Sequence, residues 1–242
     1  VIRIDPDYAR AHNNLGLAYG ELGKYEEAIE SYKQVIRIDP DYRDAHFNLG
    51  LANGELGKYE EAIESFKQVI RIVPDYAKAH YNIGLAYYKS GKYEEAIDAY
   101  KQAIRIDPDY AKAHNNLGYA YGELGKYEEA IESYKQAIRI DPDFAMAHNN
   151  LGIAYHHLGK YEEAIESYKQ AIRIDPDFAW AHNNLGTAYG ALGKYEEAIK
   201  SFKQAIRIDP DFAEAHYNLG NAYYELSKYE EAVNSCKQAI RI

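Results

Sequence analysis

The seven prolines of this 242-residue chain follow one another at a constant interval. Each proline lies 34 residues after the one before it, and each is followed by an aspartate. A fixed interval of this length is typical of repeat architectures, in which a repeat buries its apolar face only against its neighbours. The prolines are Pro6, Pro40, Pro74, Pro108, Pro142, Pro176 and Pro210.

We begin each repeat at the third residue after its proline and predict one continuous domain, 1–242. The first four residues, VIRI, look like the end of a helix, which predicts that the chain is a fragment. The expected boundaries are 1–8 for the tail of a preceding repeat, 9–42, 43–76, 77–110, 111–144, 145–178 and 179–212 for repeats 1 to 6, and 213–242 for a truncated repeat 7.

Each repeat is predicted to form two helices. In repeat 4, apolar or small residues recur every three or four positions in two runs, which is the spacing of one helical face. We expect Asp109 to cap the first helix, Gly125 to end it in a left-handed conformation, and Pro142 to end the second. The periodic residues are His114, Leu117, Gly118, Tyr121 and Leu124, then Tyr127, Ala130, Ile131, Tyr134, Ala137 and Ile138.

A glycine stands in the middle of every first helix. Glycine costs a helix up to ~1 kcal/mol relative to alanine. This predicts that another helix approaches too closely for a side chain. The glycines are Gly16, Gly50, Gly84, Gly118, Gly152, Gly186 and Gly220.

This pattern resembles the tetratricopeptide repeat along the whole chain. The family places an aromatic, Leu-Gly, Tyr, Ala, an aromatic, Ala and Pro at fixed offsets. The resemblance implies an all-α fold, a right-handed superhelical solenoid of antiparallel helix hairpins, with first helices lining a concave ligand groove. Histidine replaces the first aromatic in every repeat, Asn53 one tyrosine, Ser227 one stop glycine and Cys236 one second aromatic. In repeat 4 the matching residues are His114, Leu117, Gly118, Tyr121, Ala130, Tyr134, Ala137 and Pro142.

The repeats differ mainly on one face of the first helix. At about 100° per residue, repeat positions 2, 5, 6, 9, 12 and 13 lie opposite the packing positions. Residues vary at all of these except position 6, whereas exposed Lys, Gln and Arg of the second helices barely change. We interpret the variation as tuning to a ligand; recent duplication with uneven drift is the alternative. The candidate specificity residues are Phe47, Lys78, Tyr81, Tyr88, Lys89, Lys112, Tyr119, Met146, Trp180 and Tyr217.

We expect these residues to form three local features. Phe47, Tyr81 and Tyr88 are predicted to make one apolar pocket. Met146 and Trp180 are predicted to make another, because exposed aromatic residues and methionine often anchor partners. The lysines at positions 78, 89 and 112 give a local positive charge for an acidic side chain or a terminal carboxylate.

One asparagine occupies position 6 of every repeat. An amide both donates and accepts hydrogen bonds, so a ladder of amides suits the backbone of an extended peptide, at ~0.5–1.5 kcal/mol per bond. The run AHNNLG resembles repeats of O-linked N-acetylglucosamine transferases, whose asparagine ladder is associated with substrate peptides; asparagine is also ordinary here in the family. The carboxylate clamp of chaperone-tail binders is absent. The ladder is Asn14, Asn48, Asn82, Asn116, Asn150, Asn184 and Asn218.

Composition narrows the functional classes. The net charge of −10 and the pI of about 5.4 disfavour a general nucleic-acid role, which needs clustered cations. No apolar run is long enough to span a membrane, and no leader peptide is visible. Cys236 is the single cysteine, and histidine recurs at position 4 as a structural residue. We therefore expect no catalysis, no cofactor and no metal site, and a cytoplasmic location.

Three functions stay open at this point. The preferred interpretation is a protein-interaction scaffold that binds an extended peptide in the groove. The second is a self-assembling module that stacks head to tail through its end faces as a homo-oligomer. The third is a substrate-recruiting region of a larger enzyme such as a glycosyltransferase.

Overall fold

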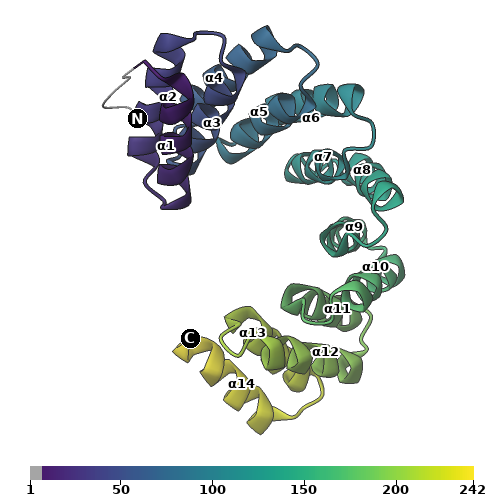
Figure 1. The fold of residues 1–242 in the computed structure, drawn as a ribbon. Coiled ribbons are helices and arrows are strands. Elements are labelled where there is room, and N and C mark those ends of the chain that lie inside the picture. Colours follow the sequence, from purple (N-terminus) through teal and green to yellow (C-terminus); the bar gives the residue numbers. More distant parts are fainter. Residues whose placement is uncertain (1–6) are drawn as a thin grey trace. The chain divides into compact units, whose positions relative to one another are not determined.

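In the computed structural model, which describes residues 7–242, the regular elements are fourteen α-helices (Figure 1). The expected tail at 1–8 lies almost entirely outside the described residues. The helices are α1 (Ala9–Glu21), α2 (Tyr25–Ile38), α3 (Arg43–Glu55), α4 (Tyr59–Ile72), α5 (Ala77–Lys89), α6 (Tyr93–Ile106), α7 (Ala111–Glu123), α8 (Tyr127–Ile140), α9 (Ala145–His157), α10 (Tyr161–Ile174), α11 (Ala179–Ala191), α12 (Tyr195–Ile208), α13 (Ala213–Glu225) and α14 (Tyr229–Arg241).

The helices fall into two compact halves, an N-terminal half that ends at Leu124 and a C-terminal half, Gly125–Ile242. Within each half, every helix packs against the next one in sequence. Consecutive odd-numbered helices of a half also contact each other, whereas its described even-numbered helices do not. The odd-numbered helices therefore line the inner side of each half, and the predicted all-helical solenoid of consecutive hairpins is confirmed.

Most of the mid-helix glycines lie against an aromatic ring of the second helix, which is the close approach of another helix that the sequence predicted. A Cβ atom built on Gly84 would lie 2.6 Å from the ring of Tyr100, and one on Gly152 would lie 2.5 Å from the ring of Tyr168. Both rings are fully buried. Gly220 meets Cys236 in the same way, at 2.6 Å from the sulfur. Glycine is required here because the two helices of a hairpin touch at this point.

The second helices bury one apolar stripe in a core that they share with the next repeat. In α6, Ala96, Ile97 and Tyr100 pack with Leu117 and Ala120 of α7. Each second helix also has two glutamates in its first turn and an arginine in its last, the charges that complement its dipole. The core therefore runs from repeat to repeat within each half.

A left-handed residue ends most of the first helices. Gly91 has φ +77°, and the next N–H, of Lys92, donates to the carbonyl oxygen of Tyr87 at 2.9 Å. Gly125 has φ +70°, as expected from the sequence. Ser227 adopts φ 56° in the same place without being a glycine. The turn is thus kept even where its preferred residue is missing.

The repeated histidines fasten the loop between hairpins. Nε2 of His114 donates to the carbonyl oxygen of Pro108 at 3.0 Å, and Nε2 of His46 to that of Pro40 at 2.8 Å. The same bond joins His148 to Pro142 at 3.1 Å. The histidines are therefore structural, as predicted, and the prolines supply an acceptor as well as a helix stop.

The prediction that Asp109 caps the first helix of repeat 4 is wrong. Tyr110 precedes α7, and no side chain caps that helix. The N–H of Asp109 instead donates to Oδ1 of Asp107 at 3.2 Å. Asp107 is the better placed carboxylate because its side chain reaches the backbone two residues on, which tightens the turn.

We predict that Gly84→Ala destabilises the chain by about 1–3 kcal/mol, since the new methyl group collides with a fully packed ring. Gly54→Ala is the matched control: it lies on the preceding odd-numbered helix, and its Cβ would meet nothing within 4 Å. That change is expected to raise stability by up to ~1 kcal/mol. Urea unfolding followed by circular dichroism measures both, and equal midpoints would contradict the close approach.

Candidate functional site

The exposed face of the odd-numbered helices carries the predicted specificity residues. Positions 2, 9 and 13 point away from the second helices, and we call this surface the inner face of each half. In the N-terminal half, Lys78, Lys89 and Lys112 are exposed on it, with Tyr119 at 44%. On the odd-numbered helices of the C-terminal half, Met146 is 52% exposed, Trp180 is 54% exposed, and Tyr217, at position 5, is 55% exposed.

Position 5 differs from the expectation that it belongs to the exposed face. Its asparagines Asn13, Asn115, Asn149 and Asn183 are buried, and Phe47 and Tyr81 are half-buried. Within each half, position 5 faces the next odd-numbered helix, because these helices approach one another, and Tyr217 on α13, the last odd-numbered helix described, stays exposed. This contact between hairpins was not visible in the helical period of a single repeat.

The position-6 asparagines bridge neighbouring repeats. Nδ2 of Asn184 donates to Oδ1 of Asn149 at 3.0 Å, and Nδ2 of Asn218 to Oδ1 of Asn183 at 3.1 Å. Each bond joins position 6 of one repeat to position 5 of the repeat before it. One N–H of each of these amides is therefore used inside the protein. A peptide would have to pair with the second N–H or with the carbonyl oxygen.

The N-terminal half shows how this bridge depends on position 5. Nδ2 of Asn116 donates to the hydroxyl oxygen of Tyr81 at 3.0 Å. Asn82 has no such acceptor, because the preceding repeat carries Phe47. Its Nδ2 donates instead to the carbonyl oxygen of Lys78, one turn back, at 2.7 Å. Among residues 7–242, Asn82 thus hydrogen-bonds only to its own helix.

The remaining ladder residues differ in accessibility. Asn14 is exposed, Asn48 is half-buried, and Asn150 is 5% exposed. Oδ1 of Asn150 accepts a long hydrogen bond from Nδ2 of Asn149 at 3.5 Å. The seven amides are therefore not equivalent, and a peptide-binding role for the whole ladder stays a prediction.

The three aromatic residues predicted to share one pocket lie in three separate contacts. The Phe47 ring packs edge-on against Phe66 and Tyr76, with centroids 5.5 and 5.6 Å apart. Tyr81 packs against the rings of Tyr100 and Tyr110 at 5.8 and 5.0 Å. Phe47 and Tyr81 therefore each pack between the second helix of their own repeat and the aromatic residue that precedes the next odd-numbered helix.

Tyr88 forms the third contact, near the end of α5. Its ring packs against Tyr93 and Tyr119 at 5.4 and 5.5 Å, and its hydroxyl donates to Oε1 of Glu123 at 2.9 Å. Burial, followed by the hydrogen bond to Glu123, raises the pKa of Tyr88 well above its usual value. Tyr88 therefore remains a neutral phenol that holds the inner face of repeat 3 to that of repeat 4.

In the C-terminal half, the Trp180 ring lies against Phe212 with centroids 4.5 Å apart. Phe212 immediately precedes α13, so Trp180 packs toward the next repeat and still exposes half of its surface. Met146 is equally exposed, on α9. Both side chains are available to a partner.

Two neighbouring histidines at the end of α9 pack against tyrosine rings. The His157 ring stacks on Tyr127 at 4.5 Å, and His156 packs edge-on against Tyr161 at 5.1 Å. Nε2 of His156 is buried without a hydrogen-bond partner. Burial, with a smaller effect of His157, lowers the pKa of His156 and keeps it neutral. Within residues 7–242, no group of three or more His, Cys, Asp or Glu side chains is arranged to hold a metal ion.

A small cleft of about 40 Å³ opens on the inner face between α3 and α5. Leu51 and Gly54 of α3 form one wall, and Leu85 and Lys89 of α5 form the other. Phe66 of α4 closes the floor. This is the point of the N-terminal half where an apolar recess meets the predicted ligand surface.

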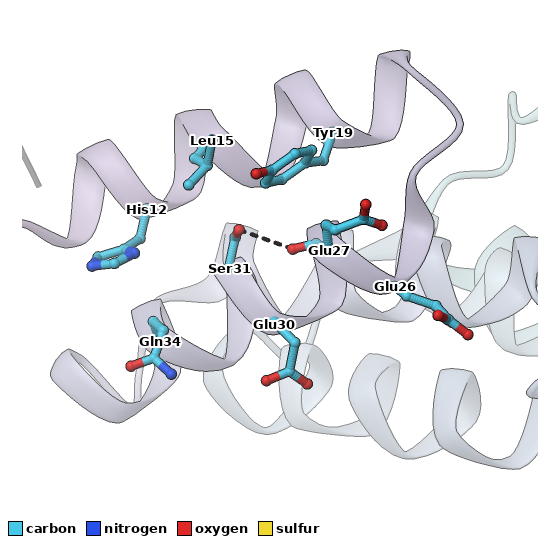
Figure 2. Close-up of a pocket in the computed structure, with 8 residues that line it drawn as sticks. All are labelled: His12, Leu15, Tyr19, Glu26, Glu27, Glu30, Ser31 and Gln34. Carbon is cyan, nitrogen blue, oxygen red and sulfur yellow. Dashed lines mark hydrogen bonds between the residues drawn. The ribbon is translucent and has the colours of Figure 1, made fainter.

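Figure 2 shows a larger, more open hollow of about 520 Å³ between α1 and α2. Leu15 and Tyr19 of α1 border it, together with glutamates of α2. In the next repeat, the counterpart of Leu15 is Leu49, which packs against α2. The hollow is therefore a surface of the kind that receives a preceding second helix, and its shape indicates a packing face.

Family models match nearly the whole chain. A model described as TPR repeat matches residues 20–57, 54–91, 84–125, 123–159, 154–193 and 188–227. Models described as tetratricopeptide repeat match 1–30 and 213–242. The chain belongs to the tetratricopeptide repeat family. The similarity to the repeats of O-linked N-acetylglucosamine transferases remains an expectation from the sequence, and the search of curated proteins gave no significant match.

Solved structures of TPR proteins share the fold. The crystal structure of MamA protein is 31% identical with a TM-score of 0.63, over 71% of this chain and 93% of that one. YrrB is 22% identical with a TM-score of 0.62, over 77% and 96%. A tetratricopeptide repeat protein from Parabacteroides merdae is 19% identical with a TM-score of 0.76, over 96% and 92%. None of the described TPR helices is long and apolar enough to cross a membrane.

We predict that Asn218→Ala destabilises this TPR protein by about 1–3 kcal/mol, because it leaves Oδ1 of the fully buried Asn183 without its donor. Asn14→Ala removes the same side chain at an exposed position, and a change within ~0.5 kcal/mol is expected. Thermal and urea unfolding compare the two variants. If Asn218→Ala were as harmless as Asn14→Ala, the bridge would not contribute to stability.

Proposed function

We propose that the chain is a protein-interaction module that binds an extended peptide segment along the inner faces of its odd-numbered helices. The proposal rests on the contrast between the packing residues and the exposed residues of the inner face. Packing residues recur almost unchanged from repeat to repeat, whereas exposed inner-face residues change, as in Met146, Trp180 and Glu214 at position 2. Exposed aromatic residues and methionine are common anchors of partners.

The electrostatics favour a protein ligand. The net charge of −10 is unsuited to a phosphate backbone, which requires a field of clustered cations. Lysines 78, 89 and 112 nevertheless stand exposed on the inner face of the N-terminal half. A chain segment with apolar anchors and a few acidic residues would fit both properties.

The family supports the same proposal. TPR proteins are interaction modules, and YrrB, which shares the fold, is described as a TPR protein with an unusual peptide-binding site. The ladder amides add polar partners for a peptide backbone, each through the N–H or carbonyl oxygen that the bridge leaves over. Several rungs would be needed, because one such bond contributes only ~0.5–1.5 kcal/mol.

The test is selection from a phage-displayed library of random dodecapeptides, followed by calorimetric titration of the enriched peptides. Trp180 is the only tryptophan and is half exposed, so its fluorescence reports binding to the C-terminal half. For peptides that change this signal, we expect Trp180→Ala to weaken binding about tenfold or more, as for an interface anchor.

Lys200→Ala on the outer helix α12 is the control, and it is expected to change binding less than about twofold, as for a residue outside the interface. No enrichment from the library would refute the proposal. So would equal losses in the two variants for peptides that perturb Trp180.

A second candidate function, head-to-tail association of copies, is favoured by α14. This helix exposes Tyr229 at 57%, Val233 at 51% and Ile240 at 84%. The counterpart of Val233 in α12 is Ile199, which is buried together with Leu219 of α13. We propose that α1 of a second copy covers α14 as α13 covers α12, with the hollow of Figure 2 facing the joint.

Light scattering against concentration tests this association. The apparent mass of the 242-residue chain is expected to rise with concentration, and Val233→Lys is expected to abolish the rise by placing a charge in the joint. Lys237→Glu, on the same helix outside the exposed apolar residues, is the control for a change of charge. A constant monomer mass up to the highest concentration would rule the association out.

A further inference from the structure

The cleft between α3 and α5 lies beside Gly54, at position 12 of repeat 2. Repeat 3 has Tyr88 at that position, where its ring covers the inner face and contacts Tyr119. A Cβ atom built on Gly54 meets nothing within 4 Å, so the space beside it is empty. The space beside Gly54 is therefore open at this joint, where a tyrosine side chain at position 12 would cover it.

The walls of the cleft are apolar and partly exposed. Leu51 is 41% exposed and Leu85 is half-buried, while Ala62, Phe66 and Ala86 complete the lining from behind. A volume of about 40 Å³ exceeds what one or two water molecules need and admits the branched end of an aliphatic side chain. Filling it would remove apolar surface on both partners from water.

Polar side chains stand on both sides of the cleft: Asn82 and Lys89 belong to α5, Glu55 to α3 and Tyr59 to α4. Nδ2 of Asn82 donates one N–H to its own helix, and its side-chain carbonyl oxygen accepts no hydrogen bond from the described residues. Lys89 is exposed and forms no ion pair within residues 7–242. Position 13 is otherwise acidic or uncharged, as in Glu21, Glu55, Glu123, His157, Ala191 and Glu225.

We propose that this cleft is a specificity pocket for an aliphatic side chain of an extended peptide, and that Lys89 pairs with a carboxylate of the same peptide. The inference rests on the proposed function, whose ligand class it narrows. Leu85 and Lys89 are one helical turn apart, about 6 Å along the axis. That distance corresponds to about two residues of extended chain, so the carboxylate lies about two residues from the aliphatic side chain.

The surroundings favour this occupant over other peptides. The apolar walls and the volume of about 40 Å³ suit the branched end of an aliphatic side chain. A carboxylate on the α5 side of the cleft would meet Lys89, whereas Glu55 lies on the α3 side. The amide of Asn82 lies between the apolar wall and the charge, where it would bond the peptide backbone that connects the two side chains.

The pocket is tested by placing in repeat 2 the tyrosine that repeat 3 has at the same position. Gly54→Tyr copies the residue of repeat 3 into repeat 2 and fills the cleft, and the open space around Gly54 lets the helix accept it. Gly190→Tyr is the matched control, because Gly190 has the same repeat position in the C-terminal half and an equally free Cβ. Circular dichroism verifies that both variants keep the helical content of the parent.

The probes are the enriched dodecapeptides that leave the fluorescence of Trp180 unchanged, each also synthesised with its acidic residue changed to the amide. We expect enrichment of Leu, Ile or Val about two residues from Asp or Glu. Gly54→Tyr is expected to weaken their binding about tenfold, and Gly190→Tyr less than about twofold. Lys89→Glu is expected to weaken binding of the acidic peptides and to leave that of the amide versions within about twofold.

The outcomes separate the pocket from the general function. Probes that lack the aliphatic–acidic pair, probes that bind Gly54→Tyr as tightly as the parent, or the absence of any such probe among the enriched peptides overturn the pocket and leave the proposed function standing. An equal effect of Lys89→Glu on acidic and amide peptides overturns the carboxylate contact. If no peptide is enriched, the proposed function fails and the pocket fails with it.

Discussion

The contact between a glycine on the first helix and an aromatic ring on the second is the constraint on which each hairpin depends. At Gly84 and Gly152 the ring lies where a Cβ atom would be, and the ring itself is fully buried. This close approach fixes how the two helices cross and therefore which side of the first helix remains exposed. A helix accepts the intrinsic cost of a central glycine because the buried ring more than offsets it.

The joints between hairpins add a second, polar level of organisation. Histidine at position 4 ties each loop to the helix that follows it, and the amides at positions 5 and 6 tie one odd-numbered helix to the next. Such bonds matter because the groups are buried, and a buried amide without a partner is costly. The same asparagines that suggest a ligand ladder thus also hold the repeats in register within each half.

The separation of packing and bridging positions from exposed positions leaves one variable surface on the first helices. Because other positions hold the helices together, the side chains at positions 2, 9, 12 and 13 can differ without disturbing the helices. In this chain they do differ from repeat to repeat. Gly54 leaves a recess where Tyr88 fills the equivalent space, and Lys89 reverses the charge found at Glu55. Within a repeat protein, small substitutions of this kind are enough to give each joint its own surface shape and charge.

By itself, the sequence determined the repeat, the two helices of each repeat, the glycine turns and the exposed side of the first helices. These depend on short-range periodicity, on the conformational freedom of glycine and on the missing N–H of proline, all of which act within about 34 residues. The expected cap was wrong, because no side chain caps α7 and Asp107 binds the N–H of Asp109 within the turn, which only backbone geometry decides.

What only the tertiary structure decided concerns contacts between repeats. The burial of position 5, the amide bridge from position 6, the separate partners of Phe47, Tyr81 and Tyr88, and the cleft beside Gly54 all arise where two hairpins meet. Their residues are 31 to 35 positions apart where they form hydrogen bonds, as in Asn183 with Glu214 and Asn218 with Asn183. The helical period within one repeat carries no information about such pairs, because it defines a direction around a helix axis and not the neighbour that lies in that direction.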